Sequence, residues 1–169
     1  MSAHRLQPLV APASVAVVGA TSREGAVGNE VRVNLQCGGD PGRLFAGNPG
    51  YRDVMGVPRC PALAELPVVP AHVTCARGDR NIEQALAEAI GLGVPAATIY
   101  SGLLLEQGDG LRERVAAQVR DAGMLLCGGN GMGIYNVRDR FWGCGFDTRQ
   151  HPVVGNVALL SQSGSGMSG

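Results

Sequence analysis

Short runs of apolar, β-branched residues alternate along this chain with segments whose apolar side chains recur every four positions. Residues 14–19 (SVAVVG) form the first such run. Val27, Val31 and Leu35 form the first helical stripe, within residues 26–36. Fully apolar runs predict strands buried on both faces, and the four-residue spacing predicts helices. Their alternation predicts a parallel sheet with right-handed crossovers.

The same pattern continues to residue 127. Further strands are predicted at residues 43–47, 71–76, 96–100 and 124–127, a helical turn at 61–67, and helices at 79–91 (capped by Asp79) and 111–122. The predicted fold class is therefore α/β: a Rossmann-like, doubly wound parallel sheet between two layers of helices.

Composition limits the partners of this domain. The 169 residues carry 14 basic and 14 acidic side chains, so no long-range field attracts nucleic acid or an anionic membrane. Five cysteines without a C-x-x-C pair suggest neither a disulfide framework nor a zinc site, and favour a reducing cytoplasm. Pro8 and Pro12 interrupt the uncharged stretch at residues 6–22, which predicts a lead-in and a strand rather than a membrane span.

Loops of small residues follow the predicted strands. In such a sheet a ligand lies outside the carboxyl ends of the strands, at the point where the strand order reverses. The loop after the first strand holds Gly19, two hydroxyl side chains (Thr21 and Ser22) and the start of the next helix, whose free N–H groups can bind a phosphate. A glycine turn needed only to reverse the chain is the alternative interpretation.

The sequence lacks the dinucleotide-binding fingerprint. That pattern requires G-x-G-x-x-G and an acidic residue at the tip of the second strand. Here Gly19 is followed by Ala20 and Thr21, and the second strand ends at Asn48 and Pro49. An NAD-dependent dehydrogenase is therefore disfavoured.

Several segments together resemble one family. They are residues 14–28 (SVAVVGATSREGAVG), 48–49, 61–67, 101–102, 128–136 (GGNGMGIYN) and 155–164 (GNVALLSQSG). In this order they resemble the CoA-binding domain of ADP-forming (NDP-forming) acetyl-CoA and acyl-CoA synthetases, which is similar to the N-terminal domain of the succinyl-CoA synthetase α subunit.

The resemblance implies a site for coenzyme A, the substrate that carries the thiol. The implied residues are Gly19, Ala20, Thr21, Ser22, Arg23, Glu24 and Gly25 near the phosphates, Asn48, Pro49 and Tyr51 at a second contact, and Ala76, Arg77, Ile99, Tyr100, Ser101 and Asn130. The segment at residues 99–101 corresponds to the one near the pantetheine arm. Tyr51 replaces a lysine of succinyl-CoA synthetases, Gly129 replaces a proline, and Ala76-Arg77 replaces an apolar residue followed by proline.

The family's remaining chemistry is expected outside this chain. The resemblance implies a phosphohistidine on a second, flavodoxin-type domain and ATP, ADP and Mg²⁺ on an ATP-grasp domain. His4, His72 and His151 lack that context, and no catalytic or metal-binding residue is predicted. We expect a CoA-binding domain at residues 1–151 and the first strand (156–161) and turn of a truncated second domain at 152–169.

Three function classes stay open. The first is the CoA-binding part of an acyl-CoA ligase, inactive alone and completed by further ligase domains or a partner subunit. The second is a stand-alone CoA-binding regulatory module. The third, disfavoured above, is an NAD(P)-binding oxidoreductase domain. We expect cytoplasmic localisation and no nucleic-acid or membrane partner.

Overall fold

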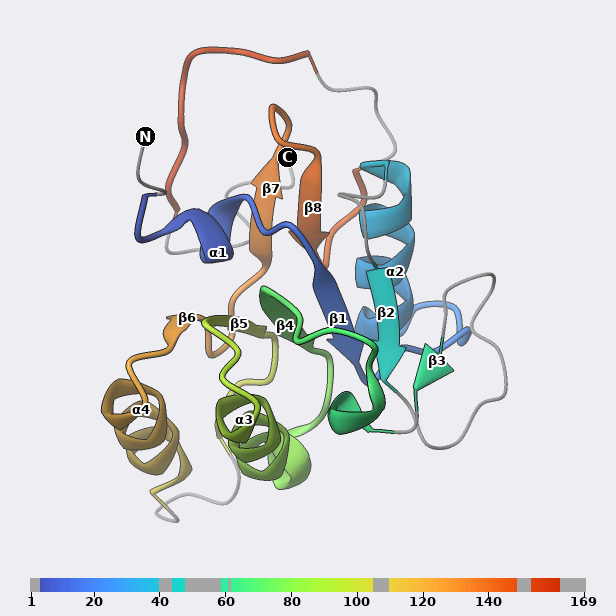
Figure 1. The fold of residues 1–169 in the computed structure, drawn as a ribbon. Helices are drawn as coiled ribbons and strands as arrows, with labels where there is room; N and C mark the ends of the chain where they lie inside the picture. The colour runs from blue at the N-terminus through green and yellow to red at the C-terminus, as the bar shows by residue number, and fades with distance from the viewer. Residues whose placement is uncertain are drawn as a thin grey trace.

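A parallel sheet of six strands forms the centre of the structure. The structure is a computed structural model, and it describes residues 4–39, 44–47, 59–60, 62–104, 110–148 and 153–161. The strands are β1 (Val15–Val18), β2 (Leu44–Gly47), β3 (Arg59–Cys60), β4 (His72–Cys75), β5 (Ala96–Ile99) and β6 (Leu125–Cys127). They lie in the order β3-β2-β1-β4-β5-β6, and all neighbours pair in parallel (Figure 1). The predicted doubly wound α/β fold is confirmed.

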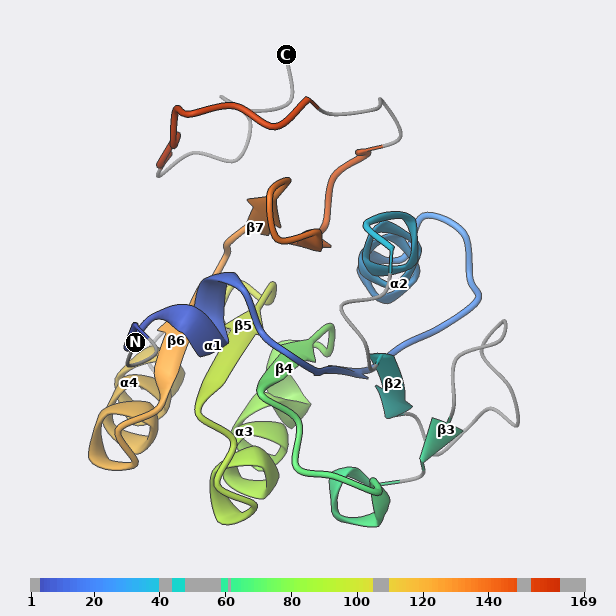
Figure 2. The ribbon, with the colours of Figure 1, turned by 45° about the horizontal axis from the view of Figure 1, so that its top comes forward.

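Helices cover both faces of the sheet. They are α1 (Gln7–Val10), α2 (Val27–Cys37), α3 (Ile82–Gly91) and α4 (Leu111–Asp121), with two 3₁₀ turns, η1 (Leu63–Glu65) and η2 (Asp79–Asn81). Figure 2 shows α1 and α2 on one face and α3 and α4 on the other. The three predicted helices and the predicted turn are therefore present, with ends that differ from the prediction by at most three residues.

The sequence of β1 is apolar at every position because both faces of the strand are covered. Val15 and Val17 pack with Leu35 of α2 in one buried cluster. Ala16 and Val18 point to the opposite face, into the cluster formed with α3 and α4. Successive side chains of a strand alternate between faces, so a strand covered on both sides needs apolar residues at every position.

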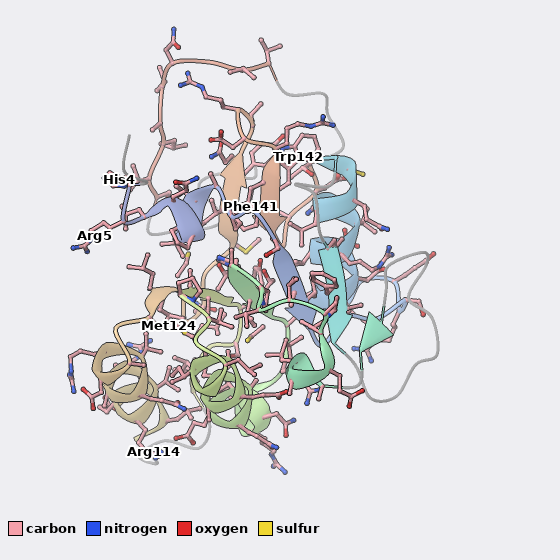
Figure 3. The ribbon with its side chains drawn as sticks, in the orientation of Figure 1. His4, Arg5, Arg114, Met124, Phe141 and Trp142 are labelled. Atoms are coloured by element: carbon pink, nitrogen blue, oxygen red, sulfur yellow. The ribbon has the colours of Figure 1, made fainter. Side chains whose placement is uncertain are left out.

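A β-hairpin on the α2 side of the sheet was not predicted from the sequence. It consists of β7 (Gly133–Asn136) and β8 (Phe141–Cys144), paired antiparallel. The Phe141 side chain is fully buried among residues of β1, β2 and α2, while Trp142 is partly exposed (Figure 3). The hairpin is therefore part of the second core.

The buried Asn34 side chain of α2 is hydrogen-bonded to the end of this hairpin and to the residues that follow it. Its amide nitrogen donates to the carbonyl oxygens of Cys144, at 2.8 Å, and Phe146, at 2.6 Å. Its amide oxygen accepts from the Thr148 hydroxyl at 2.8 Å. One polar side chain thus satisfies main-chain groups that the hairpin's own pairing leaves without partners.

His72 opens β4, within the strand predicted at residues 71–76, and is completely buried. Its Nδ1 lies 3.0 Å from the Pro8 carbonyl oxygen, which can only accept, so Nδ1 carries the proton. Its Nε2, 3.0 Å from the Thr98 hydroxyl, then accepts. Burial lowers the pKa of His72 to about 4, against the smaller effect of the Pro8 hydrogen bond, so the ring is neutral at pH 7.

Two local predictions were wrong. Asp79 does not cap a helix: it begins η2, neither η2 nor α3 has a side-chain cap, and its carboxylate binds amides of a distant loop. Residues 156–161, predicted as a strand, have no helix or strand structure, and Val157 and Leu160 are almost fully exposed. A strand needs a neighbour for its N–H and C=O groups, and none pairs with this segment within the described part of the chain.

Candidate functional site

The strand order reverses between β1 and β4, and their carboxyl ends lie side by side. A Cβ added to Gly19, which follows β1, would lie 2.6 Å from the carbonyl oxygen of Ala76, which follows β4. Gly19 also has a φ of +88°, a conformation that other residues rarely adopt. Only glycine allows the two strand ends to approach this closely.

Helix α2 begins next to Gly19. A Cβ on Gly28, in its first turn, would lie 2.3 Å from the Gly19 carbonyl oxygen. Ala26, at the N-cap, has no side chain that could accept a hydrogen bond, so the first N–H groups of α2 lack a side-chain cap. These groups carry the positive end of the helix dipole and are available to an anion.

The first loop surrounds a cavity of about 480 Å³ at this helix end. Thr21, Arg23 and Gly25 form its loop side, and the first turn of α2 and Ala76 form the rest. The Thr21 hydroxyl accepts a hydrogen bond from the Arg23 amide at 3.2 Å, which fixes the loop locally. The cavity therefore combines free helix amides with one arginine.

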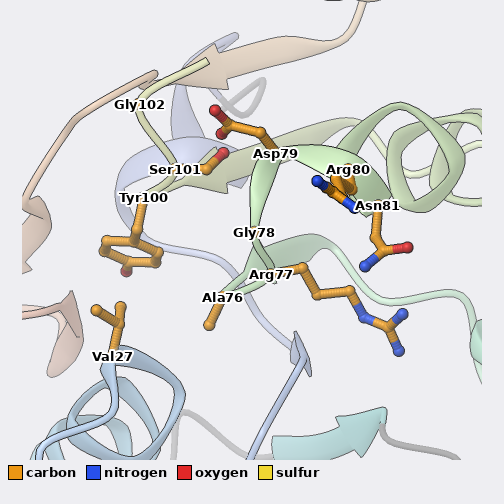
Figure 4. Close-up of a pocket in the computed structure, with 10 residues that line it drawn as sticks. All are labelled: Val27, Ala76, Arg77, Gly78, Asp79, Arg80, Asn81, Tyr100, Ser101 and Gly102. Carbon is orange, nitrogen blue, oxygen red and sulfur yellow. The ribbon is translucent and has the colours of Figure 1, made fainter. Parts of the chain in front are cut away.

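A second cavity, of about 650 Å³, adjoins the first, and both include Val27 and Ala76. Its lining comes from the connection between β4 and α3, the loop after β5 and the start of α2 (Figure 4). Figure 4 shows Tyr100 and Val27 on one side and Arg77, Arg80 and Asn81 on the other. The two cavities together follow the carboxyl edge of β1, β4 and β5.

Tyr100 connects this larger cavity with the hairpin. Its ring lines the cavity, and its hydroxyl donates a 2.9 Å hydrogen bond to the carbonyl oxygen of Gly143 in β8. Burial, with a smaller effect of neighbouring cysteine sulfurs, raises the pKa of Tyr100 well above its usual value. Tyr100 is therefore a neutral wall of the cavity.

The loop after β5 packs tightly against the loop after β6. The Asn130 amide donates to the Ser101 carbonyl oxygen at 2.7 Å, and a Cβ on Gly128 would lie 2.2 Å from the Ile99 carbonyl oxygen. The Ser101 hydroxyl is buried and has no hydrogen-bond partner within the described residues. A buried hydroxyl without a partner is uncommon and marks a place where a ligand or water would be stabilised.

Comparison with protein families identifies the domain that contains this site. Residues 13–136 match the family model of the CoA binding domain. The chain belongs to this CoA-binding domain family. The matched stretch contains both cavities and all strands of the parallel sheet.

Relatives of this CoA-binding domain include two curated enzymes of Archaeoglobus fulgidus. Acetate–CoA ligase [ADP-forming] I is 32% identical over 171 positions, covering 95% of this chain and 23% of the enzyme. Acetate–CoA ligase [ADP-forming] II is 27% identical, covering 94% of this chain and 24% of the enzyme. The chain thus spans about a quarter of the length of these relatives.

Solved structures share the fold. PH0766 from Pyrococcus horikoshii OT3 superposes with a TM-score of 0.87 at 24% identity, covering 96% of this chain and 37% of that one. The dinucleotide forming acetyl-coenzyme A synthetase 1 of Ca. Korarchaeum cryptofilum, in complex with phosphate and ADP, gives a TM-score of 0.76 at 21% identity. This match covers 82% of this chain and 30% of that one. These likenesses establish the CoA-binding domain's fold.

The structure brings half of the predicted site residues together. Those that line the two cavities are Gly19, Thr21, Arg23, Gly25, Ala76, Arg77, Tyr100 and Ser101. Ser22, Glu24 and Asn130 are exposed beside them but do not line either cavity. The side chains of Ala20 and Ile99 are buried in the cores, so only their main chains could contribute. Asn48, Pro49 and Tyr51 lie outside the described residues.

Sequence reasoning missed other residues of the cavity walls. They are Ala26, Val27 and Gly28 at the start of α2, Gly78, Asp79, Arg80 and Asn81 after β4, and Gly102 after β5. The rule that ligands lie at strand carboxyl ends was the available signal, because each of these segments directly continues a loop that the rule had selected.

Three cysteine thiols, those of Cys75, Cys127 and Cys144, are poorly suited to nucleophilic chemistry. Burial raises the pKa of Cys75 and of Cys144 to about 12, and also raises that of Cys127. In the described ranges, no three His, Cys, Asp or Glu side chains are grouped to hold a metal ion. None of the helices in these ranges is long and apolar enough to cross a membrane.

Proposed function

We propose that this domain binds coenzyme A along the carboxyl edge of β1, β4 and β5. The observation that carries the proposal is the pair of adjoining cavities at the reversal of strand order, one of which contains the uncapped start of α2. The phosphates of CoA would occupy the smaller cavity and the pantetheine arm the larger one. Membership of the CoA-binding domain family supports CoA as the ligand.

Phosphate binding in the smaller cavity is supported by its N–H groups. Two amides at the start of α2, those of Val27 and Gly28, lie at the positive end of the helix dipole. The close packing of Gly28 on Gly19 leaves no side chain between the loop and the helix end. Arg23 adds a full positive charge at the same cavity.

Binding of the pantetheine arm is supported by the mixed surface of the larger cavity. Val27, Ala76 and the Tyr100 ring offer apolar contact to its methylene groups. Main-chain groups of the loop after β5 and the unpartnered Ser101 hydroxyl can pair with its amides. The arm would pass from one cavity to the other over Val27 and Ala76, which both cavities share.

We further propose that the domain is part of an NDP-forming acyl-CoA synthetase. Curated relatives that match nearly the whole chain are ADP-forming acetate–CoA ligases about four times as long. The reaction would be acyl-CoA + ADP + Pi = acid + CoA + ATP, with ATP, ADP and Mg²⁺ bound by other domains or a partner subunit. The exposed apolar side chains of Val153, Val157 and Leu160 fit a segment, within residues 152–169, that continues into a second domain.

Isothermal titration of the 169-residue chain with CoA, NAD and NADP tests the binding proposal. We expect saturable binding of CoA and none of the other two. Val27→Glu is the informative variant, because Val27 is 44% exposed and an acidic residue in the first turn of a helix does not destabilise it. The carboxylate would sit where the phosphates bind and should abolish CoA binding without lowering the melting temperature.

Val27→Gln is the matched control, because it has the same shape without the charge. It should retain binding within a few-fold of the parent chain. Tight binding of NAD but not CoA would contradict the proposal, and equal CoA affinity in the Glu and Gln variants would remove the start of α2 from the phosphate site.

A further inference from the structure

The carboxylate of Asp79 joins two loops that belong to different strands. Its Oδ1 accepts a hydrogen bond from the Leu103 amide at 3.1 Å, and its Oδ2 accepts one from the Leu104 amide at 2.8 Å. Asp79 lies in the connection between β4 and α3, and the two leucines lie in the loop after β5. Both oxygens of one carboxylate therefore hold two consecutive amides of another segment.

This pair of amides depends on an unusual backbone. Leu103 has a φ of +54°, in the left-handed region that residues with a Cβ seldom adopt, and this turns successive N–H groups toward one point. Its side chain is buried in the core shared with α3 and α4. Asp79 supplies the acceptor for both amides of this left-handed turn.

The contact also joins two walls of the larger cavity. Gly78 and Asp79 line one wall, and Ser101 and Gly102, directly before the bound amides, line the other. Asp79 and Ser101 lie near each other in the close-up of Figure 4. Behind Ser101, the Asn130 amide fixes its carbonyl oxygen, so the loop is held from both sides.

We propose that Asp79 is a positioning residue for ligand binding in the larger cavity, acting through the Leu103 and Leu104 amides. It holds the Ser101–Gly102 segment where its main-chain groups can pair with the amides of an extended ligand arm. The proposal rests on the proposed CoA-binding function and assigns Asp79 to one part of that ligand, the pantetheine arm. The phosphate end, at the start of α2, should be independent of it.

Titration with two ligands separates these parts. Asp79→Ala should weaken binding of CoA about tenfold or more, but change binding of adenosine 3′,5′-bisphosphate, which lacks the arm, less than twofold. Added acetate should restore part of the CoA affinity of Asp79→Ala in a saturable manner, because its carboxylate can accept from the same two amides. Glu83→Gln is the control, since Glu83 is an exposed carboxylate beyond the cavity, paired with Arg114 at 2.8 Å.

Amide hydrogen exchange provides a readout that does not depend on CoA. Exchange at Leu103 and Leu104 should be at least tenfold faster in Asp79→Ala than in the parent chain or Glu83→Gln. Unchanged exchange at both amides, or equal loss of affinity for CoA and the bisphosphate, would overturn the positioning role. If the parent chain does not bind CoA, the proposed function fails and the role of Asp79 in binding fails with it, whatever the exchange shows.

Discussion

Replacing Gly28 with alanine tests whether the close approach of α2 to β1 creates the phosphate site. The added Cβ would lie 2.3 Å from the Gly19 carbonyl oxygen, and ordinary contact begins at 3.4 Å, so the start of α2 must retreat by about 1 Å. Gly19 cannot easily give way, because the Ala76 carbonyl lies against its other side. The displacement therefore falls on the amides that we assign to the phosphates.

The expected size of the effect follows from those amides. Overpacking of this kind costs about 1–3 kcal/mol, and alanine returns about 1 kcal/mol through its helix propensity, so stability should fall by no more than about 2 kcal/mol. Losing one hydrogen bond to a charged phosphate costs about 1.5–3 kcal/mol, which corresponds to a roughly 10- to 100-fold weaker Kd. Isothermal titration and urea denaturation measure the two quantities.

Two glycine variants control for the added methyl group. A Cβ on Gly91, at the end of α3, or on Gly155, in the exposed segment at residues 153–161, would meet no atom within 4 Å, and neither glycine lines a cavity. Both variants should bind CoA like the parent chain. CoA affinity and urea stability of Gly28→Ala equal to those of the two controls would refute the reasoning.

Three further predictions concern stability. Burial lowers the pKa of His72 to about 4 in the folded chain, so below about pH 6.5 the unfolded chain takes up a proton that the folded chain does not. The free energy of unfolding should therefore fall by up to about 3 kcal/mol as the pH drops from 6.5 to 4. Urea titrations of His72→Gln should lack this part of the pH dependence. Tyr100→Phe leaves the Gly143 carbonyl without its hydroxyl donor and should lower urea stability by about 1–2 kcal/mol. Asn34→Ala removes hydrogen bonds to three residues of the hairpin's end, and should cost about 2–4 kcal/mol and speed amide exchange in β8; stability and exchange like those of the parent chain would contradict this.

The sheet and the first loop were predictable from the sequence because they depend on local pattern. The run at residues 14–19 is apolar because both faces of β1 are covered, and Gly19 stands where the chain must turn. The strand-end rule then selected the edge of the sheet at which both cavities lie. Pattern and topology together were enough to place Thr21, Arg23 and Tyr100 around one site.

What could not be predicted depends on contacts between distant segments. Asp79 has the side chain of a helix cap, but its oxygens bind the amides of Leu103 and Leu104, more than twenty residues away. The hairpin escaped notice because residues 133–136 (GIYN) and 141–144 (FWGC) lack the alternation of a half-exposed strand, and residues 137–140 (VRDR) lack a glycine turn. The buried place of Phe141 follows only from the tertiary packing.

The Tyr100–Gly143 hydrogen bond has a consequence for any shortened version of this protein. The family match stops at residue 136, between the two strands of the hairpin. A chain cut there would lose Phe141 from the interior, the acceptor of the Tyr100 hydroxyl and the Thr148 partner of Asn34. A shortened chain that keeps these contacts behind the larger cavity should therefore extend to Thr148, twelve residues past the end of the family match.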